Sequence, residues 1–108
     1  MKRGDVVIAA ERSRLGGKPR PWLVVQSDAF NPTHATLTLC MISASADQEG
    51  LFRVRVEPSQ QNGLEQTSVV MIDVILSVGR RSIDKIAGRL DEETMMRIDE
   101  ALLHWLDL

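Results

Sequence analysis

The sequence predicts a mainly β domain that ends in one helix. Short apolar runs follow one another through most of the chain, and the connections between them are too short for crossover helices. Strands joined in this way pair antiparallel. After Asp91 the apolar residues recur with the period of a helix instead. A small, strongly curved antiparallel sheet or a partly closed barrel, with the helix covering one open side, fits these observations.

Six runs favour strands. The run at 22–25 (WLVV) is continuously apolar, which is typical of a strand buried on both faces. The run at 36–42 alternates threonine and cysteine with leucine and methionine, and 52–56 alternates apolar residues with arginines. Polar, glycine-containing or proline-containing segments separate the runs. The predicted strands are 6–9, 22–25, 36–42, 52–56, 68–72 and 74–78.

A helix is expected from Asp91 onwards. The Asp91 carboxylate can accept a free backbone N–H at the first turn, and two glutamates follow it at the positive end of the helix dipole. Apolar residues then form one stripe at helical spacing. They are Met95, Ile98, Leu102, Trp105 and Leu106.

The composition limits the chemistry that the chain can perform. A length of 108 residues, 44% of them hydrophobic, predicts a single domain over 1–108 with a core that needs no disulfide. The only cysteine is Cys40, and the only histidines are His34 and His104, so a cysteine-based zinc site and a histidine-rich metal centre are excluded within the chain. Neither a membrane-spanning run nor a signal peptide is evident, so we expect a cytoplasmic domain.

Arginine dominates the charged side chains, with ten arginines against three lysines. The formal net charge is -2, but residues 1–20 carry a local net of +4 and residues 91–108 a local net of -5. A basic segment can hold an anion such as a phosphate even when the chain is acidic overall. Ordinary solvated surface is the alternative interpretation.

Arg20 lies between two prolines, shortly after a glycine pair and directly before the apolar run at 22–25. The prolines hold the backbone extended, and the glycines allow a tight turn or the close approach of a ligand. The guanidinium is therefore held in a preorganised position and offers a planar fork suited to a phosphate. The alternative is a strand-end arginine paired with a carboxylate such as Asp28 or Glu57.

A series of short motifs runs in order through nearly the whole chain. They are RGDVV at 3–7, KPRPWLVVQ at 18–26, CMIS at 40–43, GL at 63–64, SVVM at 68–71 and the helical segment 91–106. Together they resemble the MazF/PemK family of toxin–antitoxin endoribonucleases. The arginine–proline pair before a β run is the most specific of these motifs.

The resemblance implies an SH3-like barrel of the CcdB/PemK-like kind and a homodimer. It also implies metal-independent cleavage of single-stranded RNA at short sequences, with no cofactor, and neutralisation by a cognate antitoxin. Arg20 matches the family's catalytic arginine. Ser43 stands where the family's catalytic threonine is expected, so it keeps the hydroxyl and lacks the methyl group. Ser27 stands where many members have asparagine.

These residues lead to a mechanistic hypothesis. RNA supplies its own nucleophile, the 2′-hydroxyl. We expect Arg20 to stabilise charge on the phosphate oxygens and to assist proton transfer. Ser43 would hydrogen-bond the phosphate or the attacking oxygen. The expected products are a 2′,3′-cyclic phosphate and a 5′-hydroxyl.

Further residues are candidates for RNA binding. Lys18 and Arg14 precede Arg20 and could grip the RNA backbone, although solvated loop charges would look the same. Phe30 is the best-placed aromatic residue for base stacking. The predicted RNA-binding set is Lys18, Arg14, Pro21, Ser27 and Phe30. For Arg53 and Arg55 we favour pairing with acidic neighbours across the sheet over contact with phosphate.

Two alternatives stay open at this point. A gyrase-poisoning toxin like CcdB would use an exposed aromatic residue near the C-terminus, and Trp105 keeps that interpretation available. Its place on the apolar stripe favours core or dimer packing instead. The other alternative is an inactive binding module with the same barrel. An antitoxin would be disordered until bound and acidic, and a basic groove at Arg20 would attract it.

Overall fold

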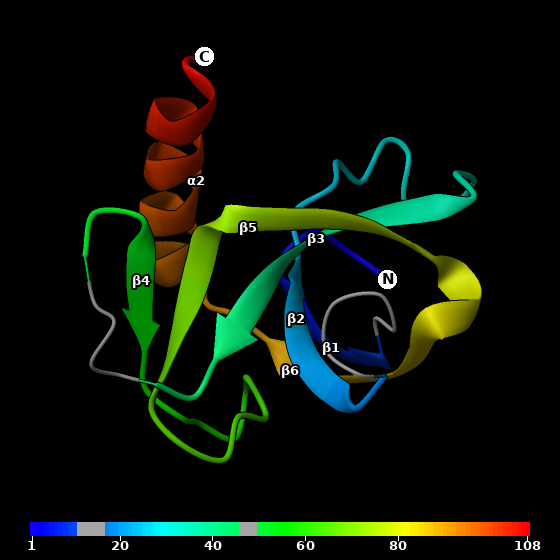
Figure 1. Ribbon diagram of the computed structural model, residues 1–108, viewed down its shortest axis with the longest axis horizontal. Helices are drawn as coiled ribbons and strands as arrows, with labels where there is room; N and C mark the ends of the chain where they lie inside the picture. The colour runs from blue at the N-terminus through cyan, green and yellow to red at the C-terminus, as the bar shows by residue number, and fades with distance from the viewer. Residues whose placement is uncertain (11–16, 46–49) are drawn as a thin grey trace.

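The computed structural model describes residues 1–10, 17–45 and 50–108. Within these residues six strands precede one α-helix (Figure 1), which confirms the mainly β class with a C-terminal helix. A short 3-10 helix, η2, separates the last two strands. The elements are β1 (Asp5–Ala10), β2 (Pro19–Val24), β3 (Thr36–Ser43), β4 (Arg53–Val56), β5 (Ser68–Gly79), η2 (Arg80–Ser82), β6 (Ile83–Arg89) and α2 (Glu92–Leu106).

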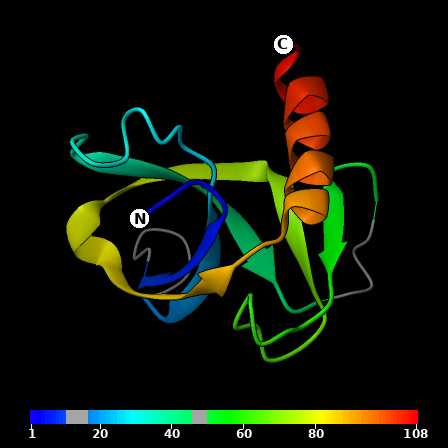
Figure 2. The same ribbon diagram turned by 180° about the vertical axis from the view of Figure 1, so that it is seen from behind.

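The strands form one antiparallel sheet in the order β4-β5-β3-β2-β1-β6. Views from the front and from behind show the sheet curving round so that the N-terminal strands close the side opposite β5 (Figures 1 and 2). The first and last strands of this order, β4 and β6, are its edges. The predicted curved antiparallel sheet is therefore present. Within the described residues no helix is both long and apolar enough to cross a membrane.

The prediction of separate strands at 68–72 and 74–78 is wrong, because both runs belong to the single strand β5. Cys40 of β3 faces Ile75, whereas its neighbour Met41 faces Met71. Three residues of β5 therefore bulge out of the pairing, and a bulge of this kind bends the strand. The bend carries β5 from one side of the curved sheet to the other.

The sixth strand lies elsewhere, in β6, which the apolar pattern did not predict. Its sequence, IDKIAGR, contains no buried residue in the structure, so it lacks the apolar alternation of an inner strand. Backbone pairing with β1 holds it in place instead, with Val7 facing Ile86 and Ile8 facing Lys85. The six strands of the structure therefore include one, β6, that the sequence pattern did not indicate.

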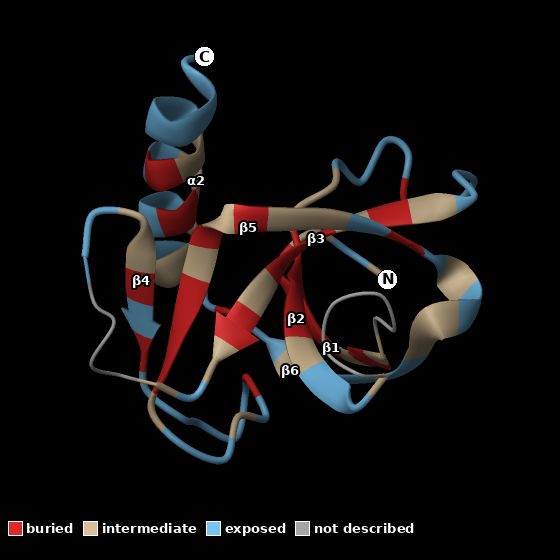
Figure 3. Cartoon of the chain, viewed as in Figure 1, coloured by how far each residue is buried: buried red, intermediate tan, exposed pale blue. Residues whose placement is uncertain are grey.

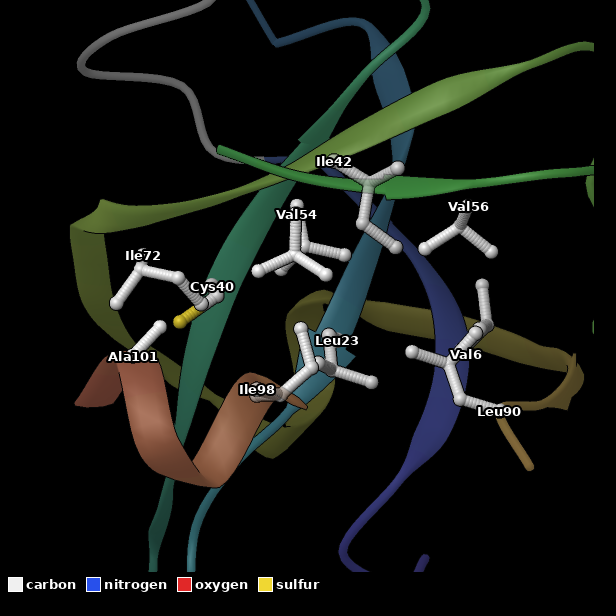
Figure 4. Packing of buried hydrophobic residues seen from close by; sticks show 11 residues of the cluster. Val6, Leu23, Cys40, Ile42, Val54, Val56, Ile72, Leu90, Ile98 and Ala101 are labelled. Atoms are coloured by element: carbon white, nitrogen blue, oxygen red, sulfur yellow. The ribbon is translucent and has the colours of Figure 1, made fainter. Parts of the chain in front are cut away.

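Both faces of the sheet are buried, as the continuous apolar run at 22–25 predicted. Leu23 packs toward α2 with Val6, Cys40, Ile42 and Ile98 (Figure 4). The neighbours of Leu23 on β2, Trp22 and Val24, belong to a second cluster on the other face. Because successive side chains of a strand point to opposite faces, one strand serves both clusters. The strand that carries Arg20 is thereby fixed from both sides.

The helix α2 packs on β4 and β5 with its first turns only. Ile98 and Ala101 are buried, while Leu103, Leu106 and Leu108 are exposed at the far end, where the helix extends beyond the sheet (Figure 3). Trp105 is 45% exposed, and its ring meets the edge of Phe52 with centroids 5.0 Å apart. The predicted apolar stripe is therefore covered in its first half and open in its second half.

Candidate functional site

Arg20 lies at a free corner of the sheet. The first three residues of β2 pair with β1, so that Arg20 faces Ala9 and Pro21 faces Ile8. Pairing with β3 begins only at Trp22. The prolines on either side of Arg20 cannot donate to a neighbouring strand, and here no strand needs their N–H groups. This explains why β2 begins at Pro19, three residues earlier than the apolar run predicted.

Ser43 is the last residue of β3, and the register of β2 and β3 indicates where it lies relative to Arg20. Trp22 faces Met41 and Leu23 faces Cys40. If this pairing continued by two residues, Arg20 would face Ser43. Because residues two apart on a strand share a face, both side chains start from the face of Trp22 and Met41. The hydroxyl of the half-buried Ser43 accepts a hydrogen bond from the Ser45 backbone N–H at 3.2 Å.

The guanidinium of Arg20 is exposed and, among the described residues, has no hydrogen-bond or ion-pair partner. Both carboxylates suggested as partners are engaged elsewhere. Asp28 accepts a hydrogen bond from the Arg3 backbone N–H at 2.7 Å, and this bond lowers the pKa of the carboxyl group. Glu57 binds Arg55 at 2.8 Å, and that contact lowers the pKa of Glu57. The charge of Arg20 is therefore available to an anion.

Arg20 and Pro21 line a pocket of about 390 Å³. Its wall is partly apolar, with Ile8, Pro21 and Leu64 among the contributors, and partly polar. The polar residues around it are Arg20, Glu65, Gln66, Ser68 and Lys85. The pocket also touches Ile42 and Ala44, whereas Ser43 between them is not among its described lining residues and starts from the other face of β3. One hollow thus joins the start of β2, the end of β3, the segment before β5, and β6.

Two glycines let the segment 61–66 form one wall of this pocket. Gly63 has a φ of +70° and, in addition, a Cβ there would lie 2.2 Å from the carbonyl oxygen of Ala87. A Cβ on Gly88 would lie 2.4 Å from backbone atoms of Gln61 and Asn62. A backbone hydrogen bond of 2.8 Å from Arg89 to the Gln61 carbonyl ties the segment to β6. This close approach explains the presence of glycine at both positions.

The predicted RNA-binding residues divide into two groups. Lys18 is exposed just before β2, and Pro21 lines the pocket. Ser27 and Phe30 lie in the turn that follows β2, at the opposite end of this strand from Arg20. Within a single chain, Ser27 and Phe30 therefore do not lie next to Arg20. Arg14 lies outside the described residues.

Arg53 and Arg55 are both paired with carboxylates, but Arg55 binds Glu57, two residues further along the chain, and not a neighbour across the sheet. Arg53 pairs across the sheet with Asp73, as the pairing interpretation predicted, and Trp22 is fully buried. Cys40 is buried, and burial raises the pKa of its thiol to about 12, so it is not a nucleophile near neutral pH.

Sequence similarity shows the family of the chain. Residues 2–106 match the family described as PemK-like, MazF-like toxin of type II toxin–antitoxin system. The chain belongs to this toxin family. A protein of Mycolicibacterium smegmatis named probable endoribonuclease MazF is 42% identical over 108 residues, which cover 100% of this chain and 98% of that protein. Endoribonuclease EndoA of Bacillus subtilis is 32% identical over 94% of this chain and 90% of its own length.

Solved structures agree with the fold. A mycobacterial endoribonuclease in complex with its cognate antitoxin superimposes with a TM-score of 0.82 at 26% identity, covering 100% of this chain and 96% of that one. The MazF-mt6 toxin of Mycobacterium tuberculosis gives a TM-score of 0.82 at 24% identity, with 96% of this chain and 97% of that chain covered. These similarities confirm the PemK/MazF-like fold and the predicted family. The relatives named as endoribonucleases favour the nuclease over the gyrase-poisoning alternative.

Sequence reasoning missed part of the pocket. Glu65 and Gln66 lie in a short segment before β5 to which the sequence pattern assigned no element, and Lys85 lies in the strand that was not predicted. The family motif at Gly63 and Leu64 was the available signal, since it marked the pocket wall without assigning it a role.

Proposed function

We propose that this toxin is an endoribonuclease that cleaves single-stranded RNA, including mRNA, at the corner formed by Arg20 and Ser43. The observation that carries the proposal is the position of Arg20, an exposed guanidinium without a partner among the described residues, held between two prolines where β2 pairs with β1 alone. The register of β2 and β3, extended by two residues, would set Ser43 opposite it. A fixed cation of this kind suits a phosphodiester, because its planar fork matches two phosphate oxygens. The relatives named MazF and EndoA support this activity.

In the proposed reaction the 2′-oxygen of one nucleotide attacks the adjacent phosphorus. A new 2′-O–P bond forms, the P–O5′ bond breaks, the 2′-hydroxyl proton passes to water and the leaving 5′-oxygen receives a proton. Arg20 stabilises the negative charge that develops on the phosphate oxygens. Ser43 donates a hydrogen bond to the phosphate or the attacking oxygen. The products are a 2′,3′-cyclic phosphate and a 5′-hydroxyl, and cleavage occurs at preferred short sequences.

Incubation of the purified protein with a long RNA in EDTA, followed by mapping of the ends, tests this proposal. We expect cleavage in EDTA and cyclic phosphate ends. The Arg20→Ala variant should lose about 10²- to 10³-fold in kcat, the typical cost of removing one oxyanion-stabilising donor. Arg97→Ala, which removes an exposed arginine from α2, is the matched control. Cleavage that stops in EDTA and returns with Mg²⁺ would refute the metal-independent route.

A supercoiling assay with gyrase separates this function from the CcdB-like alternative. The nuclease proposal expects no inhibition of gyrase by the purified toxin. Gyrase inhibition without any RNA cleavage would support the alternative instead. If the purified protein neither cleaves RNA nor inhibits gyrase, and the Ser43→Thr variant gains no RNA cleavage, the result would support an inactive binding module.

The proposal includes three features of the biological setting. The toxin acts in the cytoplasm, where mRNA is found. A cognate antitoxin inhibits it, as the complex of a similar mycobacterial endoribonuclease suggests. The active form is a homodimer, which light scattering coupled to gel filtration tests directly. Support for the dimer comes from exposed apolar residues at the end of α2, including Leu103, Leu106 and Leu108.

A further inference from the structure

The pocket beside Arg20 contains a second cation that the proposed cleavage step does not use. Lys85 lies on β6 and lines the pocket together with Arg20 and Pro21. Its side chain is exposed and has no hydrogen-bond or ion-pair partner in the described part of the chain. Both arginine and lysine therefore present an uncompensated positive charge to the same hollow.

The sheet register fixes how far apart the two charges start. Ile8 of β1 faces Pro21 of β2 on one side and Lys85 of β6 on the other. Neighbouring strands are about 4.8 Å apart, so the backbones at Pro21 and Lys85 are separated by roughly 10 Å. The backbone of Lys85 thus lies on the side of the pocket that is away from Arg20.

The rest of the lining suits a nucleotide more than a free anion. Ile8, Pro21 and Leu64 supply apolar surface in the same pocket as the two cations, and a base needs such surface against its faces. Among the described residues, Glu65 is the one carboxylate that lines the pocket. Two cations against one carboxylate leave the described lining with net positive charge, which favours a polyanion.

From this arrangement we infer that Lys85 binds a phosphate of the RNA strand next to the one contacted by Arg20. This inference rests on the proposed function, because it assigns a substrate contact to that same site. Lys85 holds the strand across the pocket and takes no part in bond breaking. It is a binding residue that contributes to substrate affinity in a way that does not depend on sequence.

A binding experiment that is independent of cleavage tests the inference. The probe is a fluorescent single-stranded RNA of mixed sequence with 2′-O-methyl groups throughout, which lacks the nucleophile. Each phosphate contact on single-stranded nucleic acid contributes about 0.7 to the slope of log affinity against log salt. We expect the slope of the Lys85→Gln variant to be smaller in magnitude by that amount. A fourfold rise in salt concentration should then lower the RNA affinity of the wild type about 2.6-fold more than that of the variant.

Two variants make the experiment specific. Lys85→Arg keeps the charge and should keep the slope. Lys2→Gln removes the same charge from an exposed residue that does not line the pocket, and its slope should equal that of the wild type. An unchanged slope in Lys85→Gln, or an equal loss in Lys2→Gln, would overturn the inference. A weaker affinity for an acidic peptide with unchanged RNA binding would point to a protein ligand and would overturn it as well.

Steady-state kinetics separate the roles of the two cations. Lys85→Gln should raise KM and leave kcat nearly unchanged, whereas Arg20→Ala should lower kcat. A fall in kcat alone for Lys85→Gln would contradict the assignment. If the wild type binds RNA with the Lys85-dependent slope but cuts nothing, the proposed function fails while the contact stands. If the wild type cuts RNA and the salt dependence of its RNA affinity is the same in Lys85→Gln, only the inference fails.

Discussion

At the scale of single residues, the proposed site needs Arg20 and Ser43 close together, and the register of β2 and β3 decides their relative position. The motif around Arg20 was visible in the sequence, since two prolines and a following apolar run already indicate a fixed arginine. Ser43 was selected only by family resemblance. The pairing of Trp22 with Met41, two residues away on each strand, would set it opposite Arg20 if the register continued. The packing of the whole sheet decides such pairings, and neither local sequence motif predicts them.

The hydroxyl of Ser43 gives a prediction at this scale. Ser43→Ala removes a donor from the reacting phosphate and should lower kcat about 10²-fold, with little change in KM. Ser43→Thr keeps the hydroxyl and should cleave RNA at least as fast as the wild type. Single-turnover cleavage of a defined RNA measures both rates. Equal rates for the alanine variant and the wild type would exclude a role for this hydroxyl.

At the scale of elements, β6 shows where sequence patterns fail. Patterns of apolar residues reveal strands that bury side chains, such as β2 and β3. The strand β6 buries none and is held by backbone pairing with β1, so its residues carry no apolar signal. The bulge in β5 misled the prediction for a related reason, because three unpaired residues interrupt the alternation of one long strand. Because β6 contributes Lys85 and Ala87 to the pocket, the pocket could be predicted only in part.

The contact between β6 and the segment 61–66 can be tested with one methyl group. In Gly88→Ala the new Cβ would meet backbone atoms 2.4 Å away, which are not free to rotate aside. We expect the segment to shift, at a cost of about 1–3 kcal/mol in the free energy of unfolding. RNA affinity should fall too, because the segment forms a pocket wall. Gly50→Ala is the control, since a Cβ added at Gly50 would meet nothing within 4 Å; similar effects of both variants would argue against the contact.

The start of α2 gives a pH-dependent prediction. The Asp91 carboxylate accepts hydrogen bonds from the Thr94 hydroxyl and backbone N–H, the latter at 2.7 Å, and these bonds hold its pKa below the ordinary 3.8. A group with a lowered folded pKa stabilises the fold above its unfolded pKa, and this contribution disappears as the pH falls through the folded value. The wild type should therefore lose part of its stability below about pH 4.

Asp91→Asn isolates this contribution, because asparagine caps a helix without titrating. Urea unfolding midpoints of both proteins are compared between about pH 7 and about pH 3. The wild type should be the more stable at neutral pH, and the difference should shrink toward acid. A difference that stays constant over this range would show that Asp91 contributes no charge-dependent stability.

At the scale of the whole molecule, the described cations of the basic N-terminal segment lie in two separate places. Lys2 and Arg3 lie before β1, whereas Lys18 and Arg20 lie beside the far end of that strand, roughly 17 Å away for a strand of this length. Arg3 is engaged with the acidic helix, because its guanidinium lies 2.7 Å from Asp99. Among the described residues, Arg20 and Lys85 are the cations that line the pocket, and they are far apart in sequence.

This division of charge predicts that Arg3 serves stability and not RNA binding. Its side chain donates to the Val25 carbonyl at 3.0 Å and binds Asp99, so it joins the chain start, the turn after β2, and α2. Arg3→Ala should lower the free energy of unfolding by about 2 kcal/mol, mostly through the bond to the carbonyl, since partly exposed ion pairs contribute little. Below the unfolding transition, its RNA affinity and cleavage rate should match those of the wild type. A variant that folds with wild-type stability but binds RNA more weakly would place Arg3 in the RNA site and would show that the N-terminal charges act as one surface.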